Sequence, residues 1–156
     1  MSTTPVLAPV AGRAVPLSDV PDPVFSAGMV GYGAAVDPPR EVVDAVAPVS
    51  GKVLKLMPHA FVIMTADNVG VLVHLGLDTV ALDGEGFTTH VAQGDEVTAG
   101  EKMITYDVPA IAANGLNPIV PVVVMDLRQA DAITPAEAVL EGAVIAPGDG
   151  LFTLTA

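Results

Sequence analysis

The chain has 156 residues, of which 51% are hydrophobic and only 4% aromatic, and its formal net charge at pH 7 is −12. This length fits a single domain over residues 1–156, with a core built mainly from aliphatic side chains. The six scattered basic residues argue against nucleic acid or anionic membranes as partners, and the absence of cysteine excludes disulfide and thiolate chemistry.

The N-terminal residues 1–5 lack the charged and apolar regions of a signal peptide and are expected to form a mobile tail. No uninterrupted apolar run approaches the length of a transmembrane helix. We therefore expect a cytoplasmic protein without a membrane-inserted segment.

Fifteen glycines and 14 prolines divide the apolar segments into short pieces, which is typical of an all-β domain. In chain order, the pattern predicts strands at 7–10, 13–17, 34–36, 46–49, 52–57, 60–65, 70–77, 87–91, 102–106, 120–125 and 151–155. Short helical turns are expected over 108–113, before Asn114-Gly115, and after Thr134, with Pro135 and Glu137 in a capping-box arrangement. We predict an antiparallel β-sandwich or flattened barrel of short strands with one or two short helical turns.

Two of the three histidines lie in adjacent apolar strands, where an unpaired polar ring is costly to bury. His59 precedes the strand 60–65, and His74 lies within the strand 70–77. The polar segment 66–70 between them predicts a hairpin that brings the two rings together. The third histidine, His90, lies in a polar context and is expected to be merely exposed.

The chemistry of the histidine pair is open at this point. With a nearby carboxylate, the two rings could bind a metal ion or act in general acid–base catalysis. Alternatively, one ring could attack phosphorus while the other contacts the phosphoryl oxygens. The spacing does not choose, because no HxH, HExxH or CxxC pattern is present. The loop 19–31 also gathers apolar side chains, either as a cover for the core or as an exposed protein contact.

A series of motifs from Leu7 to Leu154 points to a known family. They are Val20–Phe25, Met29–Gly31, Ala47–Gly51, His59–Phe61, Val73–Val80, Leu82–Phe87, Gly94–Val97 and Pro121–Val124. In this order they resemble the glucose-type enzyme IIA of the bacterial phosphoenolpyruvate-dependent sugar phosphotransferase system. The segment around His74, which ends in Asp78-Thr79-Val80, is the most specific of them.

The resemblance implies an antiparallel β-sandwich that carries a phosphoryl group between proteins. His74 would take the group on Nε2 from phosphorylated HPr, and His59 would contact it and support transfer to an enzyme IIB domain of a membrane sugar permease. Asp78 would meet a basic residue of either partner. An apolar ring would dock the partners: Val24, Phe25, Met29, Val30, Leu72 and Val80. The attacking ring must be neutral, so a backbone carbonyl is expected to hold Nδ1–H.

The resemblance implies no required cofactor, although a zinc ion bridging His59 and His74 in a partner complex stays open. One alternative function is a regulatory binding module whose partners change with phosphorylation of His74. Another is a zinc endopeptidase of the lysostaphin type, which would need a second histidine that Val73-His74-Leu75 lacks. Biotinyl and lipoyl carrier domains share some turn motifs with this chain. Their modified lysine lies at the tip of a hairpin, whereas the segment around Lys102 is predicted to be a strand, which argues against this function.

Overall fold

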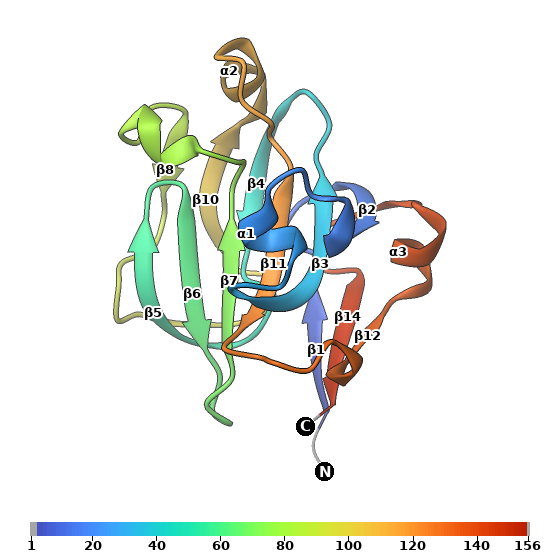
Figure 1. The fold of residues 1–156 in the computed structure, drawn as a ribbon. Coiled ribbons are helices and arrows are strands. Elements are labelled where there is room, and N and C mark those ends of the chain that lie inside the picture. The colour runs from blue at the N-terminus through green and yellow to red at the C-terminus, as the bar shows by residue number, and fades with distance from the viewer. Residues whose placement is uncertain (1–2, 156) are drawn as a thin grey trace.

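The computed structural model describes residues 3–155, and within them it contains fourteen strands and three short α-helices (Figure 1). The strands are β1 (Thr3–Leu7), β2 (Gly12–Pro16), β3 (Gly31–Asp37), β4 (Val42–Val46), β5 (Gly51–Met57), β6 (Ala60–Met64), β7 (Gly70–His74), β8 (Phe87–Thr89), β9 (Glu96–Val97), β10 (Lys102–Asp107), β11 (Val120–Met125), β12 (Ile133–Pro135), β13 (Val144–Ile145) and β14 (Gly150–Thr155). The helices are α1 (Pro23–Ser26), α2 (Val108–Ala113) and α3 (Glu137–Glu141), and 3-10 turns lie at Leu17–Asp19, Thr79–Leu82 and Ala130–Ala132.

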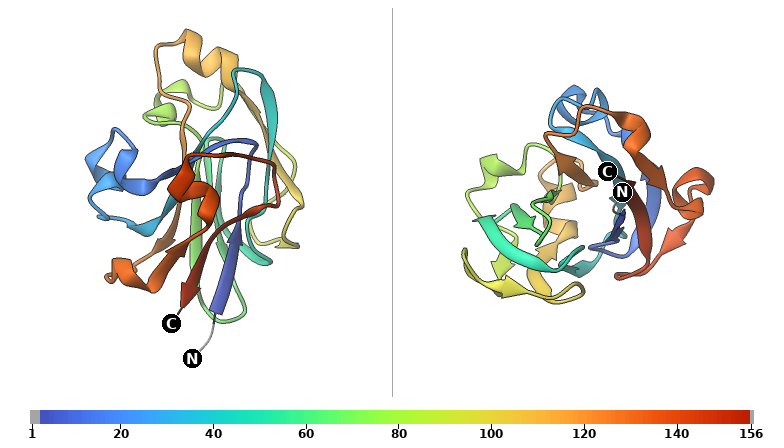
Figure 2. Two further views of the ribbon diagram at one scale, coloured as in Figure 1. Left: turned by 90° about the vertical axis from the view of Figure 1, so that its right-hand side faces the viewer. Right: turned by 90° about the horizontal axis from the view of Figure 1, so that it is seen from below.

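The strands form three antiparallel sheets. The largest has eight strands in the order β13-β2-β3-β11-β7-β6-β5-β9, and the smaller ones have the orders β1-β14-β12 and β4-β10-β8. Figure 2 shows that the strands curl around a common interior, with both termini at one end of the molecule. The predicted antiparallel β-fold of short strands with a few helical turns is therefore confirmed.

The central strands of the large sheet are buried on both faces. Val71 and Val73 of β7 belong to the main core, whereas Leu72 belongs to a second cluster with Leu17 and Phe25. Successive side chains of a strand point to opposite faces, so one strand supplies both clusters. Double burial explains why β6, β7 and β11 are almost continuously apolar in sequence.

The expected mobile tail is wrong for residues 3–5, whereas residues 1 and 2 lie outside the described part of the chain. Thr3–Leu7 form β1, which pairs with β14 in a register that sets Thr3 opposite Thr155. Val6 is fully buried. The threonines and the proline of this segment do not show the apolar pattern of a strand, but β1 lies at the edge of its sheet, where proline is tolerated.

Other element boundaries also differ from the prediction. The strand expected at 46–49 lies earlier, as β4, and the strand expected at 70–77 ends at His74. The sequence did not indicate β12, β13 or α1. The helix α2 is confirmed, with Asp107 capping its start. The capping box at Thr134 is wrong, because Thr134 belongs to β12 and α3 starts at Glu137 without a side-chain cap.

Among residues 3–155, no helix has both the length and the apolar composition required to cross a membrane.

The pairing of β1 predicts a specific loss of stability. Val6→Ala should lower the free energy of unfolding by about 2 kcal/mol, because methyl groups are removed from a fully buried site. Thr3→Ala on the exposed side of the same strand should change it by less than about 0.5 kcal/mol. Chemical denaturation of both variants measures the difference, and equally small effects would contradict a packed β1.

Candidate functional site

The hairpin of β6 and β7 brings two histidines together, as predicted. Ala60 pairs with His74 in this hairpin, so His59, one residue before β6, lies next to the end of β7. The amide of Leu75 donates to the carbonyl of His59 at 2.7 Å and extends the pairing by one step. The two imidazole rings meet edge to face, with centroids 5.1 Å apart and planes inclined by 71°.

A tight turn after β7 fixes the tautomer of His74. Nδ1 of His74 lies 2.6 Å from the carbonyl oxygen of Gly76, which can only accept, so Nδ1 carries the proton and Nε2 keeps its lone pair. Gly76 has φ of +83°, and a Cβ there would lie 2.6 Å from Thr79 Cγ2 and 2.9 Å from the Tyr106 hydroxyl. Glycine is therefore required at this position by both conformation and space.

The helix α1 covers the pair from the second core cluster. Asp22 caps the helix by accepting the amide of Val24 at 3.0 Å, and Pro23 occupies the first helical turn, where proline is favourable. The ring of Phe25 then lies 5.4 Å from the ring of His74. The sequence signal for this helix is the Asp22-Pro23 pair, an N-cap residue followed by proline in the first turn.

The residues expected in the docking surface fall into two groups. Val24, Met29 and Val80 are exposed, by 44%, 65% and 64% respectively, and Asp78 is exposed beside them. Phe25 and Leu72 are instead buried in the second cluster, and Val30 is half-buried against it. Phe25 and Leu72 thus pack in the second cluster instead of standing exposed, and the docking role of the six residues stays a prediction.

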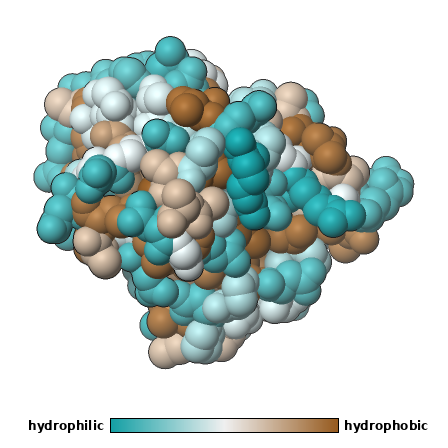
Figure 3. Space-filling view, turned by 90° about the horizontal axis from the view of Figure 1, so that it is seen from above, coloured by the Kyte–Doolittle hydropathy of each residue, from teal (hydrophilic) through white to brown (hydrophobic). Residues whose placement is uncertain are grey.

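Sequence reasoning did not include Met57, which is exposed at the end of β5, two residues before His59. Its place directly before the Pro58-His59 turn was the available signal. Figure 3 shows the end of the molecule that carries this turn, where apolar areas alternate with hydrophilic ones. The face is therefore mixed rather than uniformly apolar.

Burial keeps both rings neutral. Desolvation lowers the pKa of His74, and it outweighs the opposing effects of the hydrogen bond to Gly76 and of the carboxylates of Asp22 and Asp78. Desolvation also lowers the pKa of His59, and the neighbouring His74 lowers it further. Each histidine thus has a lower pKa than an exposed one, and Nε2 of His74 is available as a nucleophile at neutral pH.

A metal ion at this site would be bound by the two imidazole rings. Within residues 3–155, no group of three or more histidine, cysteine, aspartate or glutamate side chains is arranged to hold an ion. His59 and His74 would provide two nitrogen ligands, and a third would have to come from another molecule.

His90 lies apart from the pair and is exposed, as predicted. Its Nε2 lies 2.6 Å from the hydroxyl of Thr105, which donates to Asp44 at 2.7 Å. Hydrogen bonding to Thr105 lowers the pKa of Asp44, with Lys102 contributing from 3.4 Å. These side chains connect the strands of the sheet β4-β10-β8.

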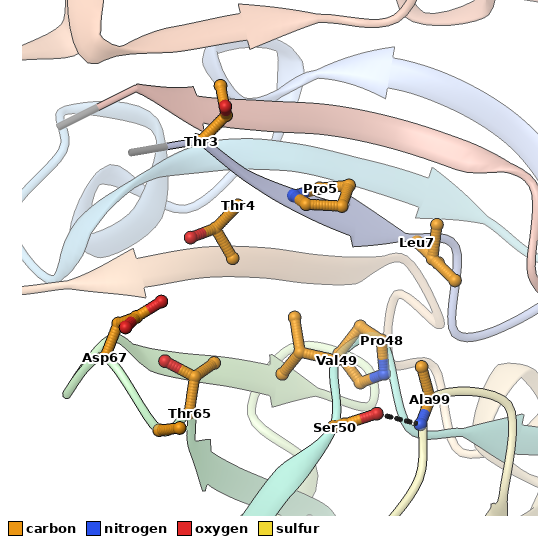
Figure 4. Close-up of a pocket in the computed structure, with 11 residues that line it drawn as sticks. Thr3, Thr4, Pro5, Leu7, Pro48, Val49, Ser50, Thr65, Asp67 and Ala99 are labelled. Carbon is orange, nitrogen blue, oxygen red and sulfur yellow. Dashed lines mark hydrogen bonds between the residues drawn. The ribbon is translucent and has the colours of Figure 1, made fainter. Parts of the chain in front are cut away.

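A hollow of about 360 Å³ lies at the other end of the hairpin, far along β6 and β7 from the histidines. Figure 4 shows its lining, in which Ser50 accepts the amide of Ala99 at 2.8 Å and Asp67 is the charged side chain. Neither His59 nor His74 lines it. The two histidines therefore lie outside this hollow.

A neutral, half-buried histidine held through Nδ1, with a second histidine beside it at the end of the β6–β7 hairpin, defines a protein that can carry a group on imidazole. The family model of the phosphoenolpyruvate-dependent sugar phosphotransferase system, EIIA 1, matches residues 4–130. The chain belongs to this family. Members are phosphotransferases that act through a phosphohistidine, and this chain is a phosphoryl carrier of the sugar phosphotransferase system.

Two relatives illustrate the family. The chain is 41% identical over 121 residues to the glucose-specific EIIA component of Oceanobacillus iheyensis. The aligned segment covers 76% of this chain and 72% of the relative. It is 44% identical over 119 residues to the mannose-specific EIIBCA component of Corynebacterium glutamicum. This aligned segment covers 76% of this chain but only 17% of that longer protein. The fused component links an EIIA unit to the EIIB and EIIC units of a sugar permease, so an EIIB unit is a partner of such domains.

A solved structure agrees with the fold. The glucose permease IIA from Mycoplasma capricolum matches with a TM-score of 0.87 and 34% sequence identity, over 99% of this chain and 97% of that one. The likeness extends beyond residues 4–130 and includes the C-terminal strands.

The depressed histidine pKa values predict a pH dependence. In the unphosphorylated protein, His59 and His74 should both titrate below 6.5, the ordinary value for histidine, with the midpoints read from ring signals by NMR. The unfolded chain binds these protons more readily, so the free energy of unfolding should fall as the pH drops below 6.5 towards the folded values. Above 6.5 their contribution to stability is fully present. A midpoint at or above 6.5 for His74 would contradict the dominant effect of burial.

Proposed function

We propose that His74 is the residue that accepts the phosphoryl group from phosphorylated HPr and passes it to the enzyme IIB component of a membrane sugar permease, on the cytoplasmic side. The observation that supports this role is the 2.6 Å contact between Nδ1 of His74 and the carbonyl of Gly76. It leaves the lone pair of Nε2 directed away from the turn, so the nucleophile needs no general base.

In the first transfer, Nε2 of His74 attacks phosphorus while the bond between phosphorus and the donor breaks. The proton stays on Nδ1, and the ring becomes a phosphohistidine whose positive charge Gly76 stabilises through its carbonyl. The second transfer reverses these steps towards the acceptor. Phosphoryl transfer needs little covalent help beyond position and charge, so a shallow site is sufficient.

His59 is suited to contact the transferred group. Its ring lies 5.1 Å from that of His74, centroid to centroid, so one ring N–H can donate to a phosphoryl oxygen. Before transfer, the pKa of His59 is lowered by burial and by His74. A phosphoryl dianion next to the ring would raise this pKa again, which lets His59 stabilise the charge during onward transfer.

The exposed side chains around the pair are suited to weak docking of two partners in turn. Val24, Met29 and Val80 offer apolar contacts, and unbranched methionine adapts to different surfaces. Asp78 adds an exposed carboxylate to a chain with net charge −12, so a partner with a basic rim is favoured.

The phosphoryl group arrives bound to a carrier, so we infer that the transfer requires no cofactor. A zinc ion between His59 and His74 would need a ligand from a partner.

His74→Ala should abolish phosphate acceptance, because the ring whose Nε2 attacks phosphorus is removed. Wild type, His74→Ala and His90→Ala are incubated with enzyme I, HPr and phosphoenolpyruvate, followed by intact mass and acid-lability measurements. One acid-labile phosphate is expected on wild type and on His90→Ala, the matched control with another histidine removed. Phosphate retained on His74→Ala would overturn the assignment.

His59→Gln should separate the two transfers. Glutamine keeps an amide donor but cannot gain charge, so acceptance on His74 should continue while onward transfer to an enzyme IIB domain slows by about 100-fold. The rates are measured by rapid quench, first with phosphorylated HPr as donor and then with isolated phosphorylated variant as donor. Wild-type onward transfer in His59→Gln would make His59 a bystander.

A further inference from the structure

The turn after His74 contains two consecutive peptide planes, and each plane is held at both of its ends. In the peptide between Leu75 and Gly76, the amide of Gly76 donates to the carbonyl of Ile119 at 3.1 Å. The carbonyl at the other end of this plane, that of Leu75, accepts the hydroxyl of Thr79 at 2.7 Å. This plane therefore cannot rotate without breaking one of two short hydrogen bonds.

The second plane, between Gly76 and Leu77, carries the contact to the histidine ring. Its carbonyl accepts Nδ1–H of His74 at 2.6 Å, and its amide donates to the carbonyl of Asn117 at 2.8 Å. The two planes meet at the α-carbon of Gly76. The orientation of the carbonyl that meets the ring thus depends on the plane before it.

Thr79 is placed for this task by burial and by shape. It is fully buried, and its methyl carbon Cγ2 occupies the space that a Cβ on Gly76 would require. Its hydroxyl is the side-chain donor that holds the first plane, whereas Ile119 holds the other end with a backbone carbonyl. The hydroxyl therefore lies in the interior of the protein.

We propose that Thr79 is a positioning residue for phosphoryl acceptance, which keeps the carbonyl of Gly76 on Nδ1 of His74 through the Leu75–Gly76 peptide. This inference rests on the proposed role of His74. Without the hydroxyl, the buried carbonyl of Leu75 loses its partner, and glycine offers little resistance to rotation of the plane. The carbonyl of Gly76 then leaves Nδ1, and the proton is free to move to Nε2, where it blocks attack on phosphorus.

The test compares Thr79→Val, which keeps the shape and removes the hydroxyl, with Thr79→Ser, which keeps the hydroxyl. The tautomer of His74 is read from the ¹⁵N shifts of its ring nitrogens in the unphosphorylated protein. Wild type and Thr79→Ser should show Nδ1–H, whereas Thr79→Val should show a mixture with Nε2–H. The rate of phosphate acceptance should fall about tenfold in Thr79→Val, the effect of one hydrogen bond to a buried carbonyl. It should stay within about twofold of wild type in Thr79→Ser.

Val139→Ala serves as a destabilised control, since Val139 is buried in α3 and lies outside the turn. It should leave both the tautomer and the rate unchanged, which separates a positioning effect from loss of stability. Should Thr79→Val not fold, Thr79→Cys with its weak donor should show an intermediate share of Nε2–H. An unchanged tautomer in the folded variant would overturn the proposal. A wild type that accepts no phosphate would instead overturn the role of His74 and leave the tautomer comparison valid.

Discussion

The chemistry of this protein depends on one hydrogen bond, from Nδ1 of His74 to the carbonyl of Gly76. An imidazole has two nitrogens of similar basicity, and only the one without a proton can attack. A carbonyl can only accept, so this contact selects the tautomer without any charged partner. A carboxylate in its place would raise the pKa of the ring and favour the protonated form, which is not a nucleophile.

The backbone around this hydrogen bond is fixed because the central strands of the large sheet are buried on both faces. β7 ends at His74 between β6 and β11, and the turn that follows is held from both neighbours. The carbonyl of His59 accepts the amide of Leu75, and the segment before β11 holds the amides of Gly76 and Leu77. Tyr106 secures that segment through the carbonyl of Pro118 at 3.0 Å. The half-buried side chain of His74 thus rests on backbone that is held by hydrogen bonds from two sides, which limits its motion.

The sequence predicted the parts of this arrangement that follow from alternation and turn chemistry. Apolar strands separated by the polar segment 66–70 gave the hairpin, and the hairpin placed His59 beside His74. Where one strand faces two cores, alternation no longer separates buried from exposed residues, so Leu72 of β7 was expected at the docking surface although it is buried. Phe25 was expected there too, because the loop around it gave no sign of the helix α1 that turns its ring inward. Edge strands such as β1 carry few apolar residues and escaped notice for that reason. The buried hydroxyl of Thr79 gave no sequence signal beyond its place in the motif, because its partner is a backbone carbonyl.

The acidic side chains near the pair have opposite effects on the two states of the carrier. Asp22 and Asp78 raise the pKa of His74, but burial of the ring outweighs them, so the free ring stays neutral and reactive. Under the proposed role, the same carboxylates repel the dianionic phosphoryl group once it is bound. Repulsion of this kind raises the free energy of the phosphorylated state and favours release to an acceptor. A carrier must pass its phosphoryl group on, and a site that bound phosphate tightly with cations would hold it. The carboxylates that act on His74 therefore suit release to an acceptor.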